Sequence, residues 1–195
     1  MPPAASGTHT LNPILVRADS EDELVSSRGG ARTEVPDTLD AQMVVDAKLA
    51  LENGSKMQLS YNVENTQRAI GTRLSSHIVR RLGMTGLREG HILVRLRGSA
   101  GQSLGAFATQ GLRLDVIGDA NDYVGKGLSG GMIVVRPSAA VGFVASANTI
   151  IGNTVLYGAT SGKLFAAGQA GERLCVRYSG ATAVGEGSGS RASEY

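Results

Sequence analysis

The segment 125–130 (GKGLSG) matches the G-x-G-x-x-G pattern of dinucleotide-binding loops. Such a loop binds a pyrophosphate only when a helix follows it, because the helix N-terminus supplies the N–H donors. Here the segment 132–135 (MIVV) follows, and a short apolar run of this kind is typical of a strand. The motif therefore predicts a turn, and we expect no cofactor-binding residue in this chain.

Two further segments contain residue types that bind ions. The segment 158–163 (GATSGK) resembles a P-loop, but its spacing is wrong and Leu164 stands where Ser or Thr would bind magnesium. Asp115, Asp119 and Asp122 lie close together in the sequence, yet the calcium-binding nonapeptide does not recur. We expect these aspartates to form turns rather than a cation site.

Nucleophiles and proton carriers are few and scattered. His9, His77 and His91 form no i, i+4 pair, although a metal or acid–base role for any one of them stays open. The single cysteine, Cys175, excludes an internal disulfide, and its apolar neighbours predict a buried thiol inside a strand. We therefore assign no catalytic and no metal-ligating residue.

Composition narrows the class of protein. The chain has 195 residues and a formal net charge of +2, which is too small to predict a nucleic-acid partner. No apolar run is long enough to cross a membrane, and the N-terminus lacks the pattern of a signal peptide. We expect a cytoplasmic protein.

The most regular feature is a series of apolar, strand-like stretches separated by glycines. Residues 98–187 contain 18 of the 27 glycines. A repeating unit of one strand and tight turns predicts an all-β solenoid, in which each unit buries its face only against its neighbours. The expected strands are His91–Gly98, Leu112–Asp119, Met132–Ala139, Ile150–Gly158, Lys163–Gly168 and Leu174–Ala181.

The segments before the repeats predict an extended arm and a cap. Residues 1–36 are rich in Pro, Ser, Gly and charge, which is typical of an arm that binds a partner. A helix is expected over 38–52, with Asp37 as its N-cap and Gly54 as its stop. Alternation then predicts a strand at Lys56–Val63, and a four-residue period predicts a helix over 71–82 that ends at Gly83. This strand and helix would cap the solenoid, and the expected divisions are 1–36, 37–59 and 60–195.

Charged side chains and glycines are expected at fixed places in the repeats. Basic residues among apolar neighbours would point outward and form either a solvated face or a subunit contact surface; they are Arg95, Arg97, Arg113, Arg136, Arg173 and Arg177. Glycines would occupy the structural turns, where they permit positive φ or close approach. They are Gly98, Gly101, Gly105, Gly125, Gly127, Gly130, Gly131, Gly158, Gly162, Gly171 and Gly180.

Long segments of the chain resemble the C-terminal GXGXG domain of the glutamate synthase large chain. The matching segments are 65–75, 98–107, 118–131, 152–162, 170–173 and 178–184. The resemblance implies a right-handed, single-stranded β-helix. It also implies a non-catalytic joint between a glutamine-amidotransferase-like unit and an FMN-binding, iron–sulfur synthase unit, which would carry the cofactors.

Two departures from that family shape the expected function. The domain stands here behind its own Met1, which resembles the small subunit of N-methylglutamate synthase and implies separate partner subunits. Residues 189–195 lack the family's His and Cys, so the C-terminal cap would be reduced or completed by a partner. The alternatives are a split glutamate synthase using glutamine or ammonia, the related subunit of formylmethanofuran dehydrogenase, and an independent assembly protein.

Overall fold

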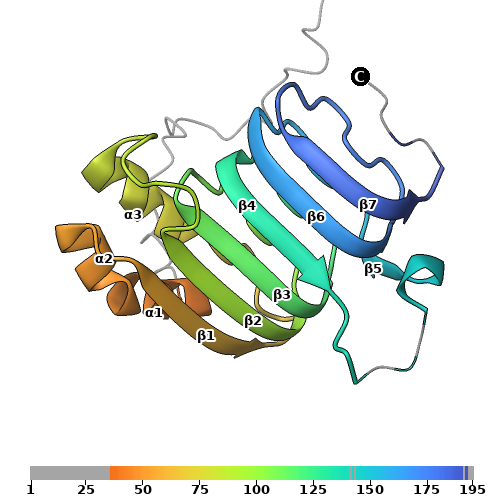
Figure 1. Cartoon of the computed structure of the whole chain (residues 1–195), viewed down its shortest axis with the longest axis horizontal. Helices are drawn as coiled ribbons and strands as arrows, with labels where there is room; N and C mark the ends of the chain where they lie inside the picture. The colour runs from red at the N-terminus through yellow and green to blue at the C-terminus, as the bar shows by residue number, and fades with distance from the viewer. Residues whose placement is uncertain (1–35, 141, 143, 191, 193–195) are drawn as a thin grey trace, which may run out of the picture. The chain divides into compact units, whose positions relative to one another are not determined.

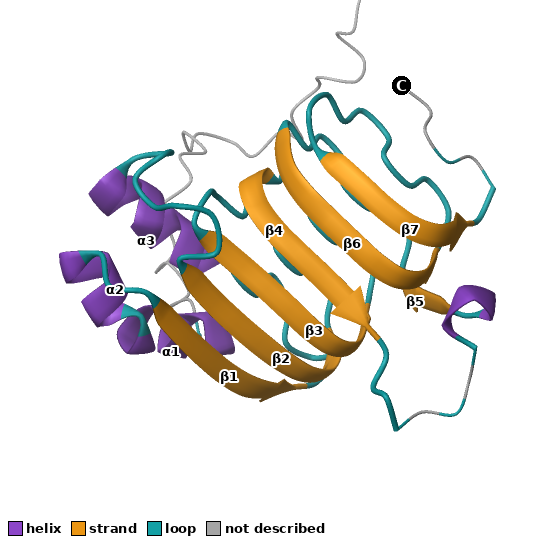
Figure 2. Ribbon diagram, viewed as in Figure 1, coloured by secondary structure: helices purple, strands orange, loops and turns teal. Residues whose placement is uncertain are grey.

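The structure, a computed structural model, describes residues 36–140, 142, 144–190 and 192. A parallel β-sheet forms the largest part of this region, as Figures 1 and 2 show. Its neighbours run in the order β1-β2-β3-β4-β6, with β7 beside β6. The strands are β1 Met57–Val63, β2 Ile92–Ala100, β3 Leu112–Ala120, β4 Ser129–Arg136, β5 Thr149–Ile151, β6 Ser161–Ala170 and β7 Thr182–Ser188. The all-β class is therefore confirmed.

The helices are α1 Leu39–Asp46, α2 Lys48–Asn53 and α3 Thr72–Leu82, with a 3₁₀ turn, η1, at Ala145–Ala147. The expected single helix over 38–52 is wrong, because Ala47, at ψ 5°, leaves the helical conformation and divides it. The predicted N-cap is also wrong: the helix begins one residue later, so Thr38 takes the cap position in place of Asp37. Gly54 does end α2, in the left-handed conformation.

The strand and the helix that follow were predicted well. β1 matches the expected strand at Lys56–Val63 within one residue, so the expected division between 59 and 60 falls inside β1. The helix α3 buries Leu74 and Ile78 on one face and ends at Gly83, as its four-residue period predicts. In Figure 1 the three helices lie beside the β1 end of the sheet.

Strict alternation sets which side chains enter the core. In β3, Leu112, Leu114 and Val116 are buried, while Arg113 and Asp115 between them are half-exposed. The register repeats this arrangement in adjacent strands, since Val94 pairs with Leu114. Each strand therefore adds one layer of apolar side chains to a continuous core.

Two expected strands are corrected by the structure. Ile150–Gly158 is a strand only over β5, because positive φ at Thr154 and Leu156 takes the chain out of the extended conformation. Leu174–Ala181 is not a strand, since Cys175 and Arg177 also have positive φ. The last strand is instead β7, which pairs in parallel with β6.

An insertion explains why the repeat spacing changes after β4. The described residues between 137 and 148 lie outside the strands of the sheet, and β5 then pairs beside the end of β3 through Ala120 and Ile151. The ends of successive units thus stack as Ala100, Ala120, Ile151 and Ala170. β4 and β5 are two parts of one unit, interrupted by a loop.

Two expectations concern the ends of the chain and the absence of a membrane-spanning segment. The arm over 1–36 lies outside the described residues except for Pro36, as do His9 and four of the last five residues. Among the described helices, none has the length and apolar character needed to cross a membrane.

Candidate functional site

The turns that connect the strands repeat one unusual backbone pattern. In each unit, three alternate residues have positive φ, and several of them are not glycine. The four sets are 103, 105 and 107; 123, 125 and 127; 154, 156 and 158; and 173, 175 and 177. Because a bulky residue rarely adopts positive φ, a conformation repeated four times at one spacing is fixed by the stacking around it.

Backbone hydrogen bonds join these turns to one another. Tyr123 N donates to Asn153 O at 2.9 Å, and Gly127 N donates to Tyr157 O at 2.8 Å, both in the following unit. Gly125 N donates in the opposite direction, to Leu104 O at 2.8 Å. The turns therefore form a second ladder opposite the strands, and both ladders hold consecutive units in register.

Close approach explains the glycines that stand in this array. A Cβ added to Gly127, which has φ +62°, would lie 2.5 Å from the ring of Phe107. A Cβ on Gly125 would lie 2.8 Å from Leu156 Cδ2, and one on Gly101 would meet the backbone oxygens of Gln67 and Asn65. A side chain at these positions would push neighbouring units apart.

The predicted glycine positions divide into two groups. The structure has seven of them in turns or irregular segments; they are Gly101, Gly105, Gly125, Gly127, Gly158, Gly171 and Gly180. Four others, Gly98, Gly130, Gly131 and Gly162, lie inside strands, which corrects the expectation of a turn. At Gly98 the reason is close backbone approach, since an added Cβ would overlap Val63 O of the paired strand.

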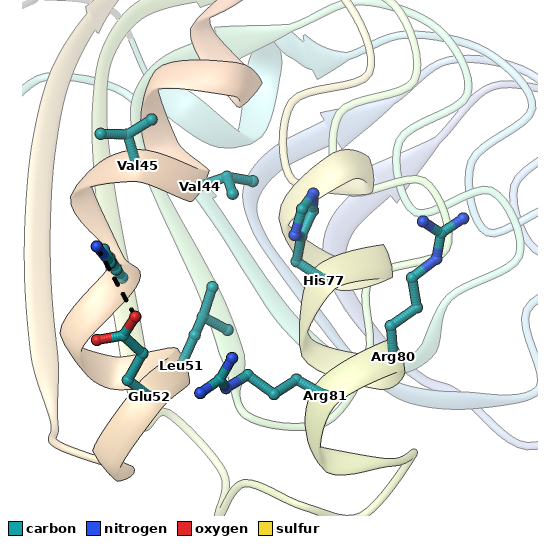
Figure 3. A pocket seen from close by; sticks show the side chains of 8 residues that line it. Val44, Val45, Leu51, Glu52, His77, Arg80 and Arg81 are labelled. Atoms are coloured by element: carbon teal, nitrogen blue, oxygen red, sulfur yellow. Dashed lines mark ion pairs between the residues drawn. The ribbon is translucent and has the colours of Figure 1, made fainter.

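A groove between the helices has a volume of about 650 Å³. Figure 3 shows Val44 and Val45 on one side and the α3 residues His77, Arg80 and Arg81 on the other. The Lys48 Nζ and Glu52 Oε1 atoms, 3.9 Å apart, form an exposed ion pair at its edge. The groove is therefore apolar at its α1 wall and basic at its α3 wall.

Two carboxylates fix the helices that form this groove. Buried Asp40 of α1 accepts the Gly71 N–H at 3.1 Å and the Arg73 N–H at 2.5 Å, at the start of α3. Burial raises the pKa of Asp40, although these N–H groups act in the opposite direction. The Tyr61 hydroxyl donates to Asp46 at 2.6 Å. Burial and the Asp46 carboxylate both raise the pKa of Tyr61. These contacts position α1 against β1 and the start of α3.

The residues with possible chemistry lie apart from one another. The Cys175 thiol is buried as expected, but it lies in a turn rather than a strand, and burial raises its pKa. Asp115 pairs with Arg113 at 2.7 Å within β3, whereas Asp122 accepts the Asn153 N–H. The expectation that all the aspartates form turns is therefore wrong for Asp115 and Asp119, which both lie in β3. In the described residues, no three His, Cys, Asp or Glu side chains are grouped to hold a metal ion.

The comparison with family models matches the GXGXG motif over residues 40–195. The chain belongs to the GXGXG motif family. Within the turn array, Gly125 and Gly127 are glycines at alternate positive φ positions, whereas the one G-x-G-x-G string of the sequence, at Gly185, Gly187 and Gly189, lies in and just after β7. The match confirms the family expected from the sequence.

The relatives of this GXGXG chain are glutamate synthases. The large chain of glutamate synthase [NADPH] from Azospirillum brasilense is 64% identical over 185 residues, covering 95% of this chain and 12% of the relative. Glutamate synthase [NADH] from Saccharomyces cerevisiae is 46% identical over 158 residues, 80% of this chain and 7% of the relative. Ferredoxin-dependent glutamate synthase 2 from Synechocystis is 47% identical over 150 residues, which cover 77% of this chain and 10% of the relative. The chain thus spans about a tenth of these proteins.

Sequence reasoning missed the set of positive φ positions in the turn array that contains no glycine. Cys175 and Arg177 fall inside the expected strand Leu174–Ala181, because only their place in the repeat, like that of Arg173 just before it, marks them as left-handed. Aligning the units would have found them, since 173, 175 and 177 follow 154, 156 and 158 at a constant offset of 19. Asp40 was missed because its role depends on a contact with α3, which is distant in sequence.

Proposed function

We propose that this chain is a structural domain of a glutamate synthase-type enzyme. The observation that carries the proposal is the pair of ladders, one of strands and one of turns, which join consecutive units on two sides. A body hydrogen-bonded in this way resists bending along its stacking axis. It would keep an amidotransferase-like unit and a flavin-containing synthase unit at a fixed separation.

The finer form of the fold belongs to the same proposal. The stacked units are coils of a right-handed, single-stranded β-helix, in which β4 and β5 belong to one interrupted coil. The chemistry belongs to the partners: FMN and the iron–sulfur cluster bind to the synthase unit. This chain contributes shape and contact surface, in the cytoplasm.

The relatives support a glutamate-forming reaction. All those described above are named glutamate synthases, and the Azospirillum protein is 64% identical. We therefore take glutamate synthesis from glutamine or ammonia as the reaction of the complex. N-methylglutamate formation from methylamine and glutamate, with release of ammonia, is the alternative that the experiment distinguishes.

An affinity purification of the tagged chain from its native cells tests the proposal. Mass spectrometry and a flavin absorbance spectrum of the eluate are the first measurements. We expect amidotransferase-like sequence and a yellow-brown flavin and iron–sulfur component in the eluate, in the same or in separate polypeptides. Turnover with glutamine against turnover with methylamine then identifies the reaction.

Other results would contradict the proposal. A colourless chain that elutes alone would leave an independent assembly protein. Co-elution of molybdopterin-enzyme subunits would instead support a role in formylmethanofuran dehydrogenase.

A further inference from the structure

The outer face of the sheet is formed by the outward side chains of β2, β3, β4, β6 and β7. In Figure 2 no described helix crosses the front of these strands, and the segment between α3 and β2 reaches only their starts, where Lys163 of β6 donates a hydrogen bond to Glu89 at 2.8 Å. A parallel sheet is usually covered on both faces. Here the turn array covers the inner face, while no described helix covers the outer face.

The centre of the outer face is apolar. Val134, Phe165 and Val184 are paired in register across β4, β6 and β7, so their side chains form one row. They line a shallow hollow of about 300 Å³, and Val184 is 53% exposed. A contiguous exposed apolar row on a rigid sheet is typical of a protein contact surface.

The rim of the outer face is basic. In the row next to the apolar one, Ile117 of β3 pairs with Arg97 of β2 on one side and with Arg136 of β4 on the other. In the apolar row itself, Asp115 of β3 lies between its register partners Arg95 and Val134. Arg113 and Lys163 already have acidic partners, at 2.7 Å and 2.8 Å. For Arg95, Arg97 and Arg136, the described residues provide no ion pair. The outward strand positions include five basic residues, Arg95, Arg97, Arg113, Arg136 and Lys163, against the acidic residues Asp115, Asp119 and Glu186.

This combination defines the chemistry of its partner. Arginines without an ion pair among the described residues, placed around an apolar centre, match a surface of opposite charge with an apolar anchor, since interface cores are apolar and charge complementarity orients the partners. The geometry points to the outer face as the binding site for an acidic protein surface with an apolar anchor, carried by the flavin-containing synthase unit. This inference rests on the proposed scaffold function, because that function supplies the partner.

Two substitutions test the outer face in the full chain. Val184→Asp introduces a charge into the apolar row, and Arg136→Glu reverses a rim charge. The matched control is Leu49→Asp, at an exposed apolar residue of α2 with 58% exposure. Circular dichroism melting checks that each variant is folded, and both test positions are exposed, so we expect wild-type melting.

The measurement is the amount of flavin-containing component retained by each tagged variant in the affinity purification. We expect about a tenfold loss or more for Val184→Asp and Arg136→Glu, with wild-type retention for Leu49→Asp. The complex should also weaken as salt is raised, because the rim contacts are electrostatic. Cross-linking from position 184 should map to an acidic segment of the partner.

Failure of this inference differs from failure of the proposed function. If the wild-type chain retains the flavin component and both outer-face variants retain it equally, the scaffold function holds and the outer face is not the site. The same conclusion follows if Leu49→Asp alone abolishes retention. If the wild-type chain retains no partner, both proposals are overturned.

Discussion

At Gly127, one missing side chain lets two turns stack. Its φ of +62° and its contact with the Phe107 ring both exclude a β-branched residue. We expect Gly127→Val to reduce the free energy of unfolding by about 2 kcal/mol or more, since left-handed backbone alone costs ~1–2 kcal/mol. Urea denaturation measures the change, and loss of partner binding should follow.

Gly142→Val is the control for that substitution, because an added Cβ there has no atom within 4 Å and the backbone is not left-handed. Gly101→Val should behave like Gly127→Val, through contact with backbone oxygens. A Gly127→Val chain that assembles normally but supports no turnover would contradict a purely structural role for these turns.

Cys175 shows how the stack can hide a reactive group. Burial raises the pKa of the thiol, so the folded chain favours the neutral form. We expect iodoacetamide at pH 8 to modify Cys175 about tenfold more slowly in the folded chain than in urea. Its contribution to stability is complete below the ordinary thiol pKa and is lost as the pH rises through the raised value.

The control is Ser179→Cys in a Cys175→Ala background, which presents an exposed thiol a few residues away. Mass spectrometry of alkylation measures both rates. Equal rates at the two positions would mean that the last turn opens easily.

At the scale of elements, Asp40 joins two helices. Its carboxylate accepts backbone N–H groups at the start of α3, although it belongs to α1. We expect Asp40→Ala to cost ~1–3 kcal/mol, because buried donors lose their acceptor. Asp40→Asn keeps the shape but cannot ionise. Because the pKa of Asp40 is raised, the wild type should lose stability relative to Asp40→Asn as the pH rises through that pKa.

Urea denaturation of the wild type and of both variants from pH 4 to pH 8 measures the free energies of unfolding that are compared. A difference between the wild type and Asp40→Asn that stays constant over this range would show that Asp40 does not titrate there.

Elements with a regular spacing of apolar residues could be predicted from the sequence. Elements whose conformation depends on pairing with a neighbouring unit could not. The pattern at Leu112, Leu114 and Val116 predicted β3, and a four-residue period predicted α3. β7 was missed because its exposed, glycine-containing sequence has no apolar alternation, and pairing with β6 determines its conformation. The outward arginines were predicted, but the apolar row of the outer face requires the register between strands.

At the scale of the whole molecule, we expect the local stability of the strands to decrease from the middle of the stack toward β7. β3 has paired neighbours along both edges, whereas β7 pairs with β6 alone among the described strands, and most of its residues are exposed. In a stack of this kind, stability depends on the interfaces between neighbouring units. The outer face therefore extends from a rigid region into a softer one, which a bound partner would stabilise.

Hydrogen exchange and a pair of truncations test this gradient in the chain without partners. Amides of β3 should exchange only through global unfolding, while those of β7 exchange through local opening. Leu114→Ala should cost ~2–5 kcal/mol, since Leu114 is fully buried, whereas Val184→Ala at 53% exposure should stay within about 0.5 kcal/mol. Partner binding should then slow exchange in β7 and leave β3 unchanged. If β7 amides were as protected as those of β3 in the isolated chain, the stack would be a single cooperative unit without this gradient.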